Sequence, residues 1–105
     1  LGKNTHMTEI NVTKTDIRKG IPSDYNSCAI ALAIKRKFRK SACVNVYGKA
    51  EVYFYKHGMA SEVFPTVTAR LPLRVRAFIR KFDSYSTGEE AAKILKPFKF
   101  KAAFK

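Results

Sequence analysis

Residues 69–83 combine an apolar stripe with a basic face, and this feature constrains the fold most. Apolar side chains recur there at intervals of three and four residues, at Leu71, Val75, Phe78, Ile79 and Phe82. The basic side chains of the segment are Arg70, Arg74, Arg76, Arg80 and Lys81. Pro72 suits a first helical turn, because its missing N–H would have no intrahelical partner there. The spacing therefore predicts a helix over residues 69–83 with a buried apolar face and an exposed cationic face.

The whole chain, like this helix, has many more basic than acidic residues. The 105 residues include 21 Lys and Arg against 8 Asp and Glu, which gives a formal net charge of +13. Such an excess raises repulsion within the chain, and a polyanionic partner relieves it. The longest apolar run, residues 28–34, is far shorter than the roughly 20 residues that cross a bilayer. We therefore expect a nucleic-acid partner, with DNA favoured over RNA, and no membrane partner.

Length and cysteine content indicate a single reduced domain. A chain of 105 residues with 46% hydrophobic residues can bury one modest core. Residues 1–6 resemble an expression-vector remnant, so we expect the domain to span residues 7–105. Cys28 and Cys43 are too few and too far apart for a zinc site or a redox pair. We predict a cytoplasmic protein that holds no cofactor.

The N-terminal half of the chain predicts one strand and one long helix. Alternating apolar residues over residues 9–13 indicate a short strand. Asp16 is placed to cap a single helical turn that Gly20 ends. Residues 28–40 predict a helix that is buried in its first half and basic in its last turns.

The second half predicts a meander, two helices and a last strand. Residues 42–47 and 50–55 form a hairpin around Gly48 and Lys49, and residues 62–69 form a third strand. Thr87 begins a capping-box sequence, so a short helix follows it through residue 95. Alternating Phe and Lys in residues 98–105 predict the final strand. The order β-α-β-β-β-α-α-β is that of a single α+β domain, an antiparallel meander with helices packed on one face.

Three basic clusters are candidates for phosphate contact: residues 35–40, the basic face of residues 69–83, and residues 96–105. The helix dipole explains some cations at the end of residues 28–40, but five in six positions exceed that need. Arginine also pairs phosphate oxygens bidentately. The predicted nucleic-acid-binding residues are Lys35, Arg36, Lys37, Arg39, Lys40, Lys49, Tyr53, Tyr55, Arg70, Arg74, Arg76, Arg80, Lys81, Lys99 and Lys101.

Three other interpretations stay open. Tyr47, Tyr53 and Tyr55 on an open sheet face could stack unpaired bases of RNA or of single-stranded DNA. The same tyrosines could simply suit half-exposed strands. The basic surface could also dock on an acidic host protein, which would make the chain a protein-interaction module.

The titratable residues do not form a catalytic or metal-binding pattern. The eight acids are scattered, and His57 is the only histidine outside the suspected remnant. No nucleophile elbow, phosphate loop or nuclease motif occurs, so we predict a non-enzymatic protein. Asp83 opposes the dipole at a helix C-terminus, and its nearby candidate partners are Ser84, Ser86 and Arg80.

Six motifs are spread over nearly the whole chain: Ile10-x-Val12, Asp16-Ile17-x-x-Gly20, Cys28-x-Ile30-Ala31-x-Ala33-Ile34, Val44-x-Val46, Leu71-Pro72-x-x-Val75-x-x-Phe78-Ile79-x-x-Phe82-Asp83 and Pro97-Phe98-x-Phe100. In these motifs the chain resembles a group of small proteins of tailed-phage and phage-satellite genomes. The resemblance implies a shared fold, a phage or mobile-element origin and a place in the host cytoplasm. It implies no functional residue. The chain departs from the group in having Ala29 where many relatives have proline, and in its strongly basic charge.

Overall fold

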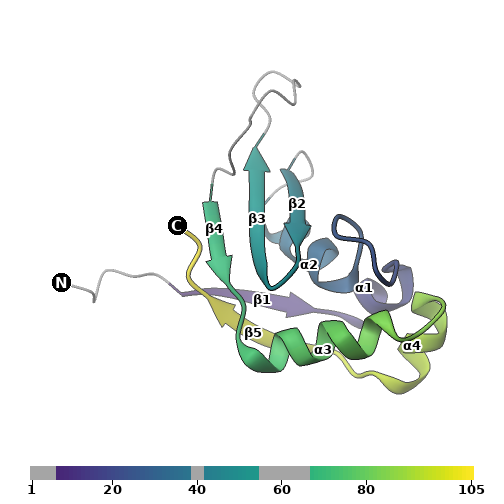
Figure 1. Cartoon of the computed structure of the whole chain (residues 1–105). Helices are drawn as coiled ribbons and strands as arrows, with labels where there is room; N and C mark the ends of the chain where they lie inside the picture. The colour runs from purple at the N-terminus through teal and green to yellow at the C-terminus, as the bar shows by residue number, and fades with distance from the viewer. Residues whose placement is uncertain (1–6, 39–41, 55–66) are drawn as a thin grey trace.

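The computed structural model describes residues 7–38, 42–54 and 67–105 (Figure 1). The suspected remnant, residues 1–6, lies outside this part of the chain. So do the predicted contact residues Arg39, Lys40 and Tyr55 and most of the predicted third strand. For Tyr53 the structure describes the backbone alone.

The described residues form a small α+β domain of five strands and four helices. In chain order these are β1 (Thr8–Val12), α1 (Lys14–Lys19), α2 (Ala29–Phe38), β2 (Ala42–Val46), β3 (Lys49–Phe54), β4 (Val67–Arg70), α3 (Leu73–Asp83), α4 (Gly88–Ile94) and β5 (Phe98–Ala102). The predicted α+β class is confirmed. The observed order contains one more helix than predicted, because the turn at Asp16 belongs to the six-residue helix α1.

The strands form two antiparallel sheets instead of one. The predicted meander is a three-stranded sheet of order β2-β3-β4, while β1 pairs with β5. In Figure 1 the two sheets run across each other, with α3 in front of the β1–β5 pair and α2 behind β2 and β3. Thr68 of β4 and Lys105 exchange two backbone hydrogen bonds of 3.1 and 3.0 Å, so the chain beyond β5 extends the pairing to β4.

The core lies where α2 meets the strands. The first half of α2 is buried almost completely, at Ala29, Ile30, Ala31, Ala33 and Ile34. The helix contacts both β1 and β2, which belong to different sheets. Since it has strands of two sheets around it, an apolar surface on all sides is stable there. This confirms the burial predicted for the first half of the helix.

Helix α3 begins later than predicted. Ala69 and Arg70 belong to β4, where they pair with Ala50 and Lys49 of β3. Pro72 is the N-cap residue of α3, and a residue that precedes proline is disfavoured in helical conformation. The predicted stripe is nevertheless confirmed, since Val75 and Phe82 are buried and Phe78 and Ile79 pack partly buried against the core.

Two local details also differ from prediction. Thr13, not Asp16, is the N-cap of α1, and the Asp16 side chain completes a capping box with it. The hairpin between β2 and β3 turns at Gly48 alone, since Tyr47 and Lys49 exchange backbone hydrogen bonds of 3.0 and 3.1 Å across it. Gly48 has a φ of +102°, a conformation that favours glycine.

Candidate nucleic-acid interface

The predicted contact residues divide between α2 and a group of elements around α3. Those on α2 are Lys35, Arg36 and Lys37. The others with described side chains are Lys49 on β3, Arg70 on β4, Arg74, Arg76, Arg80 and Lys81 on α3, and Lys99 and Lys101 on β5. Their hydrogen bonds and ion pairs separate them into residues that hold the fold together and residues that remain available for a ligand.

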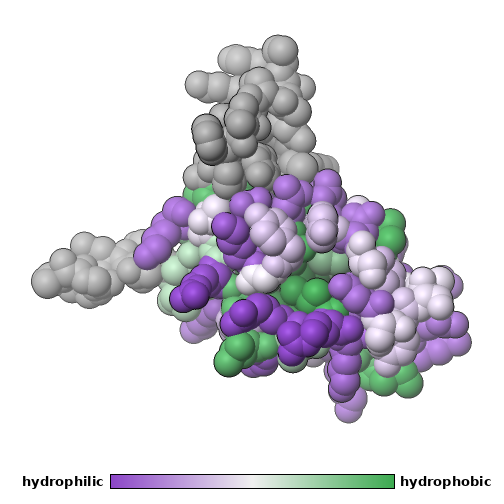
Figure 2. All heavy atoms as spheres, in the orientation of Figure 1, coloured by the Kyte–Doolittle hydropathy of each residue, from purple (hydrophilic) through white to green (hydrophobic). Residues whose placement is uncertain are grey.

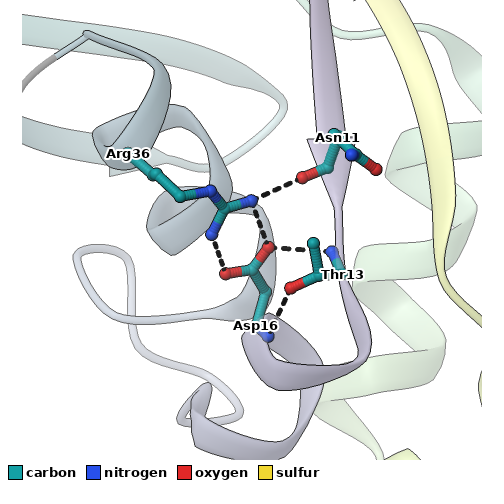
Figure 3. Close-up of polar contacts among 4 residues, drawn as sticks. All are labelled: Asn11, Thr13, Asp16 and Arg36. Atoms are coloured by element: carbon teal, nitrogen blue, oxygen red, sulfur yellow. Dashed lines mark hydrogen bonds and ion pairs between the residues drawn. The ribbon is translucent and has the colours of Figure 1, made fainter.

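Arg36 belongs to the first kind, because it is bound to a buried carboxylate (Figure 3). Its two terminal nitrogens lie 2.5 and 2.8 Å from the two carboxylate oxygens of Asp16, whose side chain is 5% exposed. Asp16 also accepts the backbone N–H of Thr13 at 2.8 Å. The hydrogen bonds to Asp16 raise the pKa of the Arg36 guanidinium. Arg36 thus links α2 to the start of α1. Its position in a run of basic residues does not predict this structural role.

Arg36 and Arg74 together bracket the β1–β5 pair. Arg36 donates to the carbonyl of Asn11 on β1 at 2.7 Å, and Arg74 donates to the carbonyl of Lys99 on β5 at 2.8 Å. Asn11 and Lys99 are direct partners in the register of the two strands. The two guanidinium groups therefore satisfy outward-facing carbonyls on opposite edges of this short sheet, where unpaired groups would invite further strands. Arg74 also lies 5.9 Å from the centre of the Phe98 ring, within the range of a cation–π contact.

A different set of cations has no partner among the described residues. The side chains of Arg70, Arg76, Arg80 and Lys81 are exposed, and none of them makes a hydrogen bond or ion pair with another described residue. Exposed arginines of this kind keep all five N–H donors for a ligand. A phosphate that binds them need not displace an existing ion pair. These four side chains are therefore available to contact nucleic acid, as are Lys37 and Lys101, which are also exposed and have no described partner.

Three of these cations, with Lys49, lie at or near the tip of the β2–β3 hairpin. Arg76 and Arg80 lie one turn apart on α3 and line a cavity together with Gly48 at the tip. Lys49 follows Gly48 and is the register partner of Arg70. We call Lys49, Arg70, Arg76 and Arg80 the tip cluster. Among the described residues, the one ion pair of the tip cluster joins Lys49 to Glu51 at 3.7 Å, a separation too long for a strong hydrogen bond.

The hydropathy of the surface agrees with an exposed tip cluster between α3 and the β2–β3 hairpin. Figure 2 shows hydrophilic side chains over the face on which α3 and the lower part of the β2–β3–β4 sheet lie, with only small hydrophobic areas between them. Acids are present here too, since Asp24 and Asp83 line the same cavity as Arg76 and Arg80. The cationic character of the face therefore depends on the unpaired arginines.

The outer face of the β1–β5 pair is more mixed in charge. Lys99 lies 3.7 Å from Glu9, and Lys101 is the register partner of Glu9. Glu9 also shares a hollow with Arg36 and Lys37 of α2. An acid thus stands between the basic end of α2 and the lysines of β5, so the structure does not join all predicted clusters into one uninterrupted basic surface.

Sequence reasoning missed two features of the face around the tip cluster. Tyr25 lies in the loop before α2, where it was not a candidate, but its ring centre is 6.0 Å from that of Tyr47. Asp83 accepts the backbone N–H of Ser23 at 2.8 Å, so its recorded partner is not one of the three nearby candidates. Both contacts join segments that are far apart in the sequence, so no local sequence pattern predicts them.

Comparison of this chain with protein families, curated proteins and solved structures found no match. Within residues 7–38, 42–54 and 67–105, no three His, Cys, Asp or Glu side chains gather closely enough to hold a metal ion. None of the described helices has both the length and the apolar character needed to cross a bilayer.

Proposed function

We propose that this protein is a non-enzymatic DNA-binding module that contacts phosphates through the tip cluster and Lys81. The observation that carries the proposal is the unpaired state of Arg70, Arg76, Arg80 and Lys81 among the described residues. Arginine forks match phosphate oxygens in geometry, and backbone phosphates supply most of the affinity of DNA-binding proteins.

The other cations support this function through the electrostatic field of the molecule, which attracts a polyanion at long range. With a net charge of +13, the protein attracts a polyanion over the whole surface and speeds its approach. The charge of Arg36 is offset by Asp16, whereas Arg74 binds a backbone carbonyl and so adds to this field without needing to touch DNA. A phage or mobile-element origin, with action in the host cytoplasm, fits such a module and remains a prediction.

Fluorescence anisotropy with a labelled duplex of about one and a half helical turns tests the proposal. Each phosphate contact lowers log K by about 0.9 per tenfold increase in salt, so five contacts, one for each residue of the tip cluster and one for Lys81, predict a slope of roughly −4.5. The triple variant Arg70→Gln, Arg76→Gln, Arg80→Gln should reduce the slope by about 2.7. Binding that is weak and independent of salt, or a slope that the triple variant leaves unchanged, contradicts the proposal.

Binding of single strands or RNA is the second candidate, and one observation favours it. Tyr25 and Tyr47 are 64% and 45% exposed and lie beside the unpaired arginines. Exposed aromatic rings near cations are typical of proteins that stack unpaired bases. Of the predicted tyrosines, Tyr47 alone has a described side chain, so Tyr25 and Tyr47 now form the candidate platform.

A further inference from the structure

A cavity of about 290 Å³ opens between the loop before α2, the tip of the β2–β3 hairpin and α3. Its lining brings together three kinds of surface. Cys28, Val46 and Ile79 contribute apolar atoms, Tyr25 and Tyr47 contribute aromatic rings, and α3 contributes two arginines. Since these residues come from segments far apart in the sequence, only the fold reveals the combination.

The apolar part of the cavity is suited to a flat, uncharged ring. Cys28 and Val46 are buried. Burial raises the pKa of the Cys28 thiol, which therefore stays protonated and uncharged at neutral pH. The volume is at the low end for ligand pockets, so the cavity can take one small ring system but not an extended ligand.

The two tyrosines give the cavity an aromatic rim. Their planes make an angle of 64°, an edge-to-face arrangement in which one ring presents its face and the other its edge. The backbone N–H of Val46 donates to the Tyr25 carbonyl at 3.0 Å, which fixes the loop against β2. The position of Tyr25 is thus set by its backbone, and the residue remains 64% exposed.

Polar groups at the cavity would fix the orientation of such a ring. Arg76 and Arg80 have no described partner and can take a phosphate attached to it. Oδ1 of Asp83 accepts the Ser23 N–H, while its Oδ2 receives no recorded hydrogen bond from the described residues. A carboxylate oxygen in this position can accept an N–H from the edge of a nucleobase. A nucleotide combines an aromatic ring that has an N–H edge with a linked phosphate.

We propose that this cavity binds one unpaired nucleobase of the bound DNA, stacked on the ring of Tyr25 and in edge contact with Tyr47, with its phosphate on Arg76 and Arg80. The inference rests on the proposed function, because the tip cluster must first hold the phosphate backbone. It adds a preference for DNA that carries an extrahelical or single-stranded nucleotide. A base that is already unpaired binds at less cost, since no stacking or pairing has to be broken.

Two duplexes of identical length test the inference, one fully paired and one with a single bulged 2-aminopurine. Anisotropy gives the affinity for each, and 2-aminopurine fluorescence reports stacking. We expect the bulged duplex to bind roughly tenfold more tightly, at the low end of base–aromatic stacking, with quenching on binding. Tyr25→Ala should abolish both the preference and the quenching, and should leave affinity for the paired duplex within about twofold. Ile94→Ala, which changes a side chain on α4 that is also 64% exposed, should alter neither.

The outcomes separate the inference from the function on which it rests. Salt-dependent binding of equal strength to both duplexes overturns the inference and leaves the phosphate contacts standing. A preference for the bulge that survives in Tyr25→Ala also overturns it, because the base then binds elsewhere. Failure to bind either duplex overturns the proposed function and the inference together.

Discussion

Replacement of Asp16 by alanine should destabilise the domain far more than the loss of an ordinary surface charge. Asp16 is a buried acid that accepts hydrogen bonds from Arg36 and from the backbone of Thr13. Alanine removes the capping-box acceptor at α1 and releases the guanidinium that joins α2 to it. The same change leaves Arg36 free to contact other anions.

The magnitude follows from the contacts that are lost. The backbone bond to Thr13 contributes about 1 kcal/mol, and charge-assisted bonds to a buried carboxylate contribute about 1.5–3 kcal/mol. Because the Arg36 side chain is 51% exposed, solvent screening places its share at the lower end of that range. We therefore expect Asp16→Ala to lower the free energy of unfolding by roughly 2–4 kcal/mol, a large part of the 5–15 kcal/mol typical of a domain.

Urea denaturation followed by circular dichroism measures this loss, with Arg76→Ala as the control. Arg76 is also an exposed arginine on a helix but has no described partner, so its removal should change stability by less than about 0.5 kcal/mol. In a double-mutant cycle, Asp16→Ala and Arg36→Ala should couple by at least about 1 kcal/mol. Equal, small effects of Asp16→Ala and Arg76→Ala, or zero coupling in the cycle, would refute this reasoning.

Three further changes test the packing. A Cβ at Gly88 would lie 2.4 Å from the backbone oxygens of Gly20 and Ile17, so Gly88→Ala should separate α4 from α1 and lower the melting temperature by roughly 10 °C or more; an unchanged value contradicts this contact. Thr87→Ala removes the hydroxyl that accepts the Glu90 N–H and should cost about 1 kcal/mol in urea denaturation, whereas no loss would show that the cap is dispensable. In a Cys43→Ala background, Cys28 should react slowly with a disulfide reagent at pH 8 until urea unfolds the domain, because burial raises its pKa; fast reaction of the native protein would show an open site.

Local periodicity predicts much of this fold. The stripe from Val75 to Phe82 required a helix on a core, and the alternation that begins at Phe98 required a strand with one buried face. Thr87 opened a helix where its hydroxyl could cap the chain. These signals work because a helix or strand of fixed period places neighbouring residues on one face whatever the rest of the chain does.

The boundaries and the site depended on contacts between distant residues. Arg70 is basic like the helix that follows, but its pairing with Lys49 makes it part of a strand. Arg36 looks like any other cation of α2 until the fold brings Asp16, 20 residues away, to its side chain. Neither can be found from local sequence, because the partner is specified only by the tertiary structure. The basic residues could therefore be listed from the sequence, but not divided into structural and available ones.

The most direct test of the account compares two variants that lose the same charge at different places. Arg76→Gln with Arg80→Gln removes two cations of the tip cluster, and Lys93→Gln with Lys96→Gln removes two exposed lysines in and just after α4. Anisotropy with one duplex at one salt concentration gives the affinity of each. We expect a loss of at least tenfold for the arginine variant and less than about threefold for the lysine variant, since direct phosphate contacts outweigh general attraction. Equal losses in the two variants would show that net charge alone binds DNA and would contradict the assignment of the tip cluster.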